Sequence, residues 1–293
     1  MQPIRFHSEC IPCLIEKALN QIPENSPEAE KLSFSKTVLH IILDAPVTVT
    51  APEIVAKITD LTTATFATKD NYSEIKHYFN SLMLSKEEYI KSKIKASDNP
   101  LYLALCYAML GNYIDFGAMN SVDENYLNSI LNTANELEFD SHEFINLKSD
   151  LQYAKSLVYI TDNCGEIVMD KLFIEQIKKV YPLLDITVIV RGAPVLNDAT
   201  IEDALAVGLD KTAPVIPNGT NIAGTCLDKI SEKALNAIEN ANVIISKGQG
   251  NFETLSYLNK NIYYLFLCKC NHFANRFGVK RHAGMMLNDL RMK

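Results

Sequence analysis

The chain has 293 residues, of which 47% are hydrophobic and 22% charged, so it can bury a sizeable core in one or two globular domains. Its formal net charge of −7 excludes the strongly basic surface that nucleic-acid binding needs. No apolar run is long enough to span a membrane, and the first residues lack the apolar segment of a signal peptide. We therefore expect neither nucleic acid nor a membrane as a partner. Seven cysteines without a secretory signal predict reduced thiols in the cytoplasm.

Helices dominate the first third of the chain. Apolar residues recur there at helical spacing, and strand-like alternation is absent. The predicted helices cover residues 13–19, 33–43, 52–58, 71–84 and 86–96. A polar break over residues 96–100 ends this part. We predict an all-helical N-terminal domain over residues 1–98.

The pattern changes after two further predicted helices, at residues 101–110 and 124–137. Short apolar runs rich in β-branched residues then alternate with polar loops and helical segments. The predicted strands cover residues 157–160, 185–190, 213–216, 242–246 and 261–267. One predicted helix begins at residue 166, and two others cover residues 201–207 and 226–239. Such alternation predicts a parallel sheet with helices on both faces. We expect residues 99–293 to form an α/β/α sandwich of Rossmann-like type.

Polar residues follow the predicted strands at the points where they end. Asp162 and Asn163 come directly after the first strand, and Asp198 lies in the loop after the second. Lys247 and Lys269 follow the two last strands. Because the carboxyl ends of parallel strands lie at one edge of a sheet, we expect these side chains to converge.

The converging residues suit the hydrolysis of a phosphate ester. Asp162, Asn163 and Asp198 offer three oxygen ligands to one divalent cation, which would polarise a phosphoryl group and position a water molecule. Lys247 and Lys269 would neutralise phosphate oxygens. The simpler alternatives are that Asp162 only caps the following helix and that both lysines lie on the solvated surface.

Three further residues support this interpretation. Gly248 and Gly250 would let backbone N–H groups approach a ligand closely. Glu166 begins the helix after the first strand, where it would orient a water molecule or cap the turn.

Taken together, several motifs resemble those of the metal-dependent damage-control phosphatases, formerly domain of unknown function eighty-nine and related to acidic-residue methyltransferase-like proteins. The motifs are Asp162-Asn163-Cys164-Gly165-Glu166, Gly111-Asn112-x-Ile114-Asp115, Asn197-Asp198, Lys247-Gly248-Gln249-Gly250-Asn251-x-Glu253 and Lys269-Cys270. The chain looks like the compact prokaryotic subgroup. The resemblance implies a helical N-terminal domain on an α/β/α core. It also implies hydrolysis of small phosphorylated metabolites, such as damaged or surplus sugar phosphates, with Mn²⁺, Co²⁺, Ni²⁺ or Mg²⁺.

The resemblance also implies roles for individual residues. The metal ligands would be Asp162, Asn163 and Asp198, and Lys269 would contact substrate phosphate. The catalytic residues would be Asp162, Asn163 and Lys269, with attack either by water or by Asp162 itself. The substrate-binding residues would be Asn112, Asp115, Glu166, Lys247, Gly248, Gly250, Glu253 and Lys269. The family's Arg-Thr-x-Lys motif is replaced by Leu267-Cys268-Lys269, so the substrate stays open.

His7, Cys10 and Cys13 form an H-x-x-C-x-x-C motif near the start of the chain. A structural zinc site takes four ligands, so a second metal at Cys10 and Cys13, with His7, would need its fourth ligand from Cys268, Cys270 or His272. A thiol redox element and simple burial of the thiols are the other interpretations.

Two other functions stay open at this point. One is a carboxylate O-methyltransferase that uses S-adenosylmethionine, although the turn after the first strand carries a carboxylate where an adenosyl pocket needs glycine. The other is a non-catalytic metal-binding or redox-sensing module. The sequence does not indicate an oligomeric state.

Overall fold

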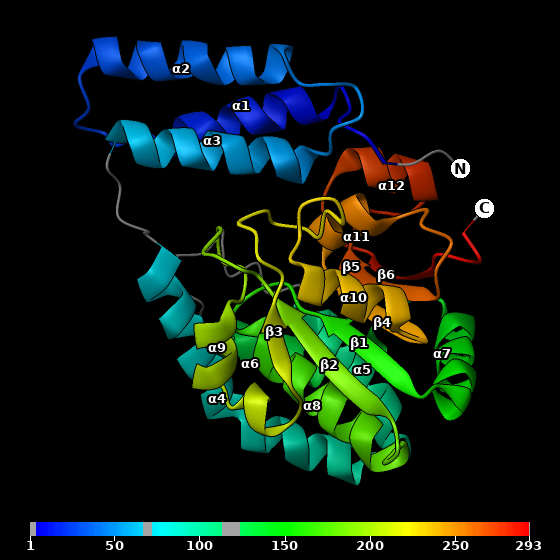
Figure 1. The fold of residues 1–293 in the computed structure, drawn as a ribbon. Coiled ribbons are helices and arrows are strands. Elements are labelled where there is room, and N and C mark those ends of the chain that lie inside the picture. Colours follow the sequence, from blue (N-terminus) through cyan, green and yellow to red (C-terminus); the bar gives the residue numbers. More distant parts are fainter. Residues whose placement is uncertain (1–3, 67–71, 113–123, 293) are drawn as a thin grey trace.

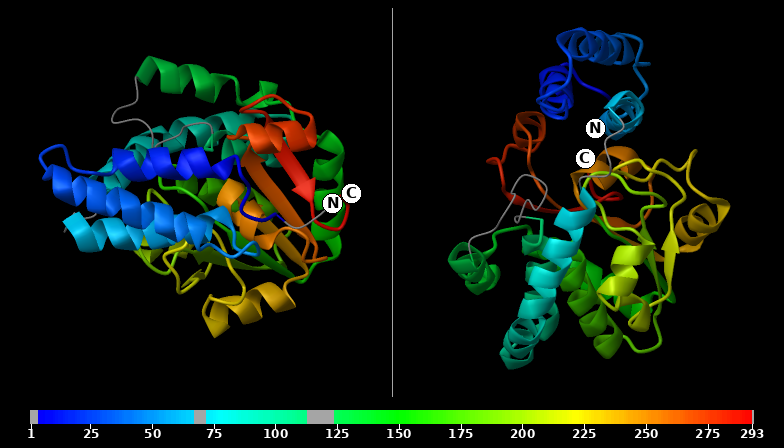
Figure 2. Two further views of the ribbon diagram at one scale, coloured as in Figure 1. Left: turned by 90° about the horizontal axis from the view of Figure 1, so that it is seen from above. Right: turned by 90° about the vertical axis from the view of Figure 1, so that its left-hand side faces the viewer.

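The computed structural model describes residues 4–66, 72–112 and 124–292 (Figure 1). Three helices open the chain: α1 (Cys10–Asn20), α2 (Glu28–Leu43) and α3 (Ala51–Phe66). They pack around a small apolar core of their own, which contains Leu14, Phe34 and Ile54. Figure 2 shows that this unit lies at one end of the molecule, beside the sheet domain.

The next helix, α4 (Tyr72–Ala96), is continuous where the sequence predicted two helices. Polar residues around Ser85 suggested a break, but the apolar side of the helix runs unbroken from Phe79 through Met83 to Ile90. These residues belong to the main core, because α4 packs against α8 (Glu166–Val180) and α5 (Pro100–Leu110). Helix α4 therefore shares the main core with the sheet. The domain boundary expected after residue 98 stays a prediction.

A six-stranded sheet forms the centre of the described chain, in the order β3-β2-β1-β4-β5-β6. The strands are β1 (Ser156–Ile160), β2 (Asp185–Val190), β3 (Val215–Pro217), β4 (Val243–Lys247), β5 (Ile262–Leu267) and β6 (Gly284–Asn288). The pairs from β3 to β5 are parallel, which confirms the predicted sheet. Strand β6 pairs antiparallel with β5 and was not predicted.

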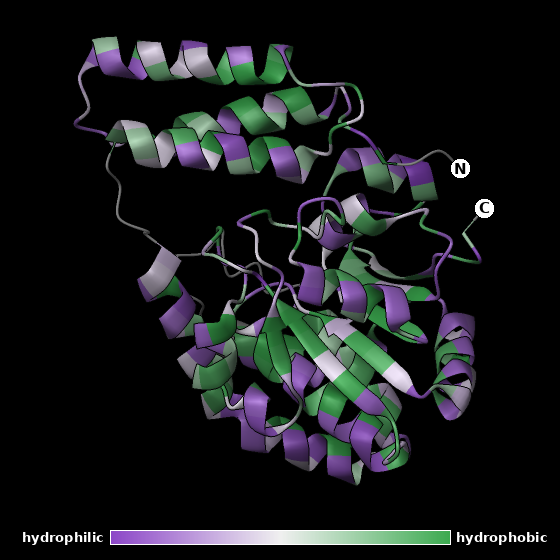
Figure 3. Ribbon diagram, in the orientation of Figure 1, coloured by the Kyte–Doolittle hydropathy of each residue, from purple (hydrophilic) through white to green (hydrophobic). Residues whose placement is uncertain are grey.

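Helices cover both faces of the sheet, which confirms the α/β/α class. Alternate residues of β1 point to opposite faces, so that Leu157 and Tyr159 join the core beneath α4, α5 and α8, and Val158 and Ile160 join the other core. The sheet is among the most hydrophobic parts of the ribbon (Figure 3). The remaining helices are α6 (Glu124–Asn132), α7 (Ser141–Tyr153), α9 (Ile201–Ala206), α10 (Glu232–Asn240), α11 (Gln249–Leu255) and α12 (Asn271–Phe277), with short 3₁₀ turns at Ala134–Glu136 and Leu209–Lys211.

The helical unit touches loops at the carboxyl edge of the sheet. Helix α3 packs against α11, which directly follows β4. Asp60 of α3 accepts a hydrogen bond from the amide of Asn221 at 2.9 Å, and Glu53 pairs with Lys229. Both partners lie in the segment between β3 and α10, so the unit covers part of the edge where the polar residues were expected. Among the described helices, none has the length and apolar character needed to cross a bilayer.

We expect Met83→Ala to lower the free energy of unfolding by about 2–5 kcal/mol, because it empties a fully buried position between α4 and the sheet core. Leu43→Ala on α2 is the control, since that side chain is 76% exposed and surface changes stay within about 0.5 kcal/mol. Urea titrations followed by circular dichroism measure both. Equal losses would contradict the placement of α4 in the core.

Candidate active site at the carboxyl edge of the sheet

Strand β1 lies between β2 and β4, where the strand order reverses direction. In open α/β sheets such a switch point leaves a crevice at the carboxyl ends of the strands, and ligands bind there. Asp162 follows β1, Asp198 lies in the loop after β2, and Gly248 follows β4. The fold therefore brings residues from three neighbouring strands to the place where such a crevice is expected.

Two loops are joined backbone to backbone at this crevice. The N–H of Cys164 donates to the carbonyl of Asn197 at 2.8 Å, and the N–H of Ala199 donates to the carbonyl of Asp162 at 2.8 Å. Between these bonds Asn163 and Asp198 form an isolated antiparallel bridge. The three predicted metal ligands are thus adjacent, although Asp198 lies more than thirty residues further along the chain.

Two asparagine amides tie the carboxylates of Asp162 and Glu166 together. The amide of Asn163 donates to Asp162 Oδ2 at 2.7 Å and to Glu166 Oε2 at 3.1 Å. The amide of Asn112 donates to the same two oxygens, at 3.1 Å each. Its own Oδ1 accepts from the backbone N–H of Leu267 at 3.2 Å, which anchors the end of α5 to the end of β5. Asn112 therefore lies beside Asp162 and Glu166, and its predicted contact with substrate stays a prediction.

The carboxylates at the crevice carry more negative charge than the nearby cationic side chains neutralise. Burial raises the pKa of Asp162 to about 8, and the nearby carboxylates of Asp198 and Glu166 add to the effect, against the opposing charges of Arg191 and Lys269. Burial also raises the pKa of Asp198. A divalent cation would remove this excess, and carboxylate and amide oxygens are its preferred ligands. The donor set of Asp162, Asn163 and Asp198 thus fits a hard divalent metal.

Arg191 is a buried part of the site that the sequence did not single out. Its Nε donates to Asp198 Oδ2 at 2.6 Å, and its Nη1 donates to the amide oxygen of Asn251 at 2.9 Å. Its Nη2 lies 3.6 Å from Asp162 Oδ1 and has no hydrogen-bond partner among the described residues. The sequence offers one indication of this role: Arg191 directly follows β2, and Asp162 likewise lies just beyond the end of β1.

Lys247 was predicted to contact substrate phosphate, and its contacts argue against that role. The side chain is fully buried, and its ammonium donates to Glu166, to Asp170 Oδ1 at 2.7 Å and to the carbonyl of Ala108 at 2.7 Å. An ammonium has three N–H donors, so all of them are used inside the protein. Burial alone would lower the pKa of Lys247, but the two carboxylates outweigh it and raise this pKa. Lys247 is a structural cation beneath the crevice.

Gly248 does not present a free donor as predicted, and both glycines of this loop lie close to other parts of the chain. The N–H of Gly248 donates to Leu265 at 3.0 Å in the sheet. Its φ is +83°, and a Cβ there would lie 2.1 Å from Asp162 Oδ2, so the absent side chain makes room for the carboxylate. A Cβ on Gly250 would lie 2.1 Å from the carbonyl oxygen of Ala223. Both glycines permit close contacts within the protein.

The remaining predicted residues fall at different distances from the crevice. Lys269 lies near enough for its charge to act on Asp162, and its backbone N–H donates to Gln249 Oε1 at 3.1 Å. Glu253 accepts from the same glutamine at 2.9 Å, and burial raises its pKa to about 7. The charged neighbour of Glu253 is Lys17 of α1, so this carboxylate lies toward the helical unit. Asp115 lies outside the described residues.

Helix α4 supports the turn from the opposite side. Gly165 has a φ of +76°, and its N–H donates to Asn80 Oδ1 at 2.7 Å. The amide of Asn80 donates in turn to Asp203 Oδ1 at 3.0 Å, and Asp203 pairs with Lys76 at 2.7 Å. The turn that carries Asp162 is therefore fixed by a helix that precedes the sheet in sequence.

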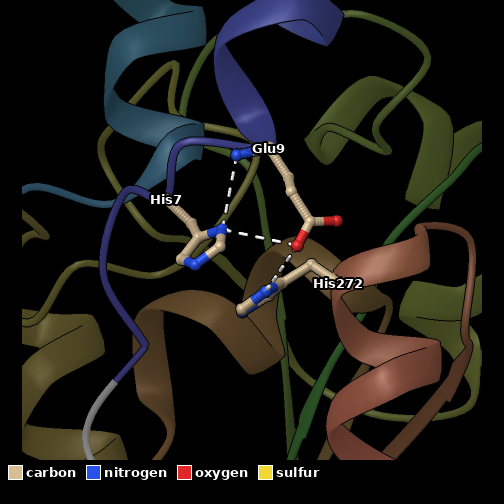
Figure 4. Close-up of side chains that lie close together, drawn as sticks. All are labelled: His7, Glu9 and His272. Carbon is tan, nitrogen blue, oxygen red and sulfur yellow. Dashed lines mark hydrogen bonds and ion pairs between the residues drawn. The ribbon is translucent and has the colours of Figure 1, made fainter.

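The N-terminal motif forms a second polar cluster. All seven cysteines are free, with Cys13 exposed and Cys10 partly buried. The side chains that gather closely are those of His7, Glu9 and His272 (Figure 4). A second metal at Cys10 and Cys13 stays a prediction.

We expect Gly248→Ala to destabilise the protein more than Gly278→Ala, because the first change adds a clash with Asp162 to the strain of a positive φ. Gly278 is a matched control, with a φ of +64° and nothing within 4 Å of an added Cβ. Strain alone costs about 1–2 kcal/mol. Urea unfolding of both variants measures the difference, and equal losses would show that Asp162 does not require the space at Gly248.

The chain is similar to several known proteins. A family model described as the damage-control phosphatase ARMT1-like domain matches residues 6–285. The chain is 35% identical over 217 residues to a damage-control phosphatase of Pyrococcus horikoshii, covering 73% of each protein. It is 33% identical over 216 residues to a damage-control phosphatase of Archaeoglobus fulgidus, covering 72% of this chain and 73% of that one. An uncharacterized protein of Methanocaldococcus jannaschii is 32% identical over 290 residues, 95% of this chain and 93% of its own.

A solved structure shares the fold over almost the whole chain. The crystal structure of a DUF89 family protein from Pyrococcus horikoshii matches 98% of this chain and 99% of its own, with a TM-score of 0.85 and 25% sequence identity. The resemblance that the motifs indicated is confirmed. The chain belongs to the damage-control phosphatase ARMT1-like family.

Proposed function

We propose that this protein is a metal-dependent phosphatase that hydrolyses small phosphorylated metabolites. The observation that carries the proposal is the crevice at the switch point, where two aspartates and an asparagine from separate loops meet in an excess of buried negative charge. The relatives named as damage-control phosphatases support the reaction class. The cysteine usage supports a cytoplasmic location, since a reducing compartment keeps thiols unpaired.

Asp162, Asn163 and Asp198 would hold the divalent cation, which is Mn²⁺, Co²⁺, Ni²⁺ or Mg²⁺ in this proposal. When bound, the metal would polarise the phosphoryl group and supply positive charge to its oxygens. The donation from Arg191 Nε to Asp198 Oδ2 fixes one ligand, and the amide of Asn112 fixes another at Asp162. Such outer contacts keep ligands in place before the metal arrives.

The other roles in the proposed reaction belong to residues of the protein. Lys269 would meet the substrate phosphate, because its charge acts on the same crevice as Asp162. Glu166 is held between Lys247 and the two asparagine amides, so it orients Asn163 and does not serve as a mobile base. Two nucleophiles stay open in the proposal, a water molecule and the carboxylate of Asp162.

The test is phosphate release by the full chain from a panel of small phosphate esters, after removal of metal with a chelator and with each metal restored in turn. We expect activity only with a divalent metal. Asp162→Asn and Asp198→Asn should each lower turnover by at least about a hundredfold, the scale of losing one electrostatic contact to a transition state. Asp228→Asn, at an exposed carboxylate, is the control.

Two outcomes would overturn the proposal. One is phosphate release that the two aspartate variants leave intact, which would remove the metal assignment. The other is methyl transfer from S-adenosylmethionine to carboxylates with no phosphate release, which would favour the methyltransferase alternative.

Lys269→Met separates substrate binding from metal binding at the same site. We expect its KM for a phosphate ester to rise about tenfold or more, because a charge-assisted contact to phosphate contributes about 1.5–3 kcal/mol. The affinity for Mn²⁺, measured by calorimetry, should not fall. Lys280→Met removes an exposed lysine eleven positions further on and should change neither value. An unchanged KM in Lys269→Met would exclude Lys269 from phosphate binding.

A further inference from the structure

His7, Glu9 and His272 form a cluster that includes none of the residues assigned to phosphate hydrolysis (Figure 4). His7 and Glu9 lie just before α1, and His272 lies in the first turn of α12. The rings of His7 and His272 lie 4.1 Å apart, centroid to centroid, at an angle of 30°. The Nδ1 atoms of both rings lie 3.8 Å from Glu9 Oε1. One ligand atom from each of the three side chains lies within 4.8 Å of the other two.

These separations do not correspond to direct hydrogen bonds. Protein N–H···O bonds span about 2.7–3.2 Å, and both Nδ1 atoms lie 3.8 Å from the carboxylate oxygen. Ligand atoms about 2.0–2.2 Å from a zinc ion at tetrahedral angles lie about 3.3–3.6 Å apart. The two separations from Glu9 Oε1 are therefore a few tenths of an ångström wider than in a tetrahedral site, and rotations of the side chains would bring the three ligand atoms to tetrahedral spacing.

Nδ1 of His7 is able to act as a metal ligand. It accepts a long hydrogen bond, 3.3 Å, from the backbone N–H of Glu9, so it does not carry the ring proton, and a metal ion would replace this donor at its lone pair. Figure 4 shows Nδ1 of His7 and Nδ1 of His272 both turned toward the same carboxylate oxygen. Two imidazole nitrogens and one carboxylate oxygen are a donor set that suits zinc and other borderline metals.

Exposure leaves room for a further ligand. The side chains of His7 and Glu9 are 42% and 48% exposed, and that of His272 is 21% exposed. Water can therefore take the fourth position of a tetrahedral ion. Cys10 and Cys270 lie close enough to affect each other's ionisation, but they are not among the atoms that share the cluster.

We propose that His7, Glu9 and His272 bind a zinc ion that joins the segment before α1 to α12. This ion is distinct from the divalent metal proposed at Asp162. Two of its ligands belong to the helical unit and one to the sheet domain, so binding fastens the unit onto the carboxyl edge of the sheet. Lys269 lies three residues before His272, so the same ion stabilises the chain next to the proposed phosphate contact.

The test measures Zn²⁺ bound to the full chain after chelator treatment and dialysis, by elemental analysis and calorimetry. We expect His7→Ala and His272→Ala each to weaken one zinc equivalent by at least about tenfold, since loss of an outer-shell partner alone costs about 10–100-fold in affinity. Asp198→Asn should keep that equivalent. His142→Ala is the matched control, because His142 also pairs with a carboxylate two residues away and is 88% exposed.

Two further measurements test the proposed zinc site. Zn²⁺ should raise the unfolding temperature of the wild type, of Asp198→Asn and of His142→Ala, and this increase should be lost in His7→Ala. The Co²⁺-loaded protein should lack a sulfur-to-metal charge-transfer band. Equal zinc binding by the wild type and both histidine variants would overturn the proposal. So would a charge-transfer band that is lost in Cys10→Ser, because it would move the site to the cysteines.

Discussion

The balance of buried charge at the carboxyl edge of the sheet is the constraint on which the rest of this structure depends. Among the described residues, four carboxylates lie there: Glu166, Asp170 and Asp198 are buried, and Asp162 is 13% exposed. Taking an ion out of water is costly unless it is paired. Lys247 compensates Glu166 and Asp170 from below, and Arg191 compensates Asp198 from the side. Asp162 accepts hydrogen bonds from the neutral amides of Asn112 and Asn163, and its contact with the cation of Arg191 is longer, at 3.6 Å. The least compensated carboxylate is therefore the one that faces the crevice.

Part of this site can be predicted from the sequence, because the topology of a parallel sheet determines which ends of its strands lie together. Parallel strands bring their carboxyl ends to one edge whatever their side chains are, so the positions of Asp162, Asn163 and Asp198 after their strands predict that they meet. The backbone pairing of the two loops, which fixes the ligands within a few ångströms, depends on loop conformations. Strand periodicity alone does not contain that information.

The role of Lys247 shows where sequence reasoning stops. A lysine at the end of a strand is compatible with a phosphate contact and with a buried ion pair. Alternation along β4 separates the two possibilities, since Val243, Ile245 and Lys247 share one face, and that face packs against α5 and α8. The position of Asp170 one turn beyond Glu166 in α8 is the second indication. Neither indication decides between a phosphate contact and a buried ion pair until it is known which helix covers which face of the sheet.

The contact between Asn80 and the turn at Gly165 bears on the order in which the site is built. The partners of Asn80 lie 85 and 123 residues away along the chain, and closing such long loops costs entropy before any contact compensates it. During synthesis α4 emerges well before β1 and α9, so the full support of the turn that carries Asp162 requires the chain through Asp203. A truncated chain that ends before Asp203 would keep the partner of Gly165 but lose the hydrogen bond that orients the amide of Asn80 toward that turn.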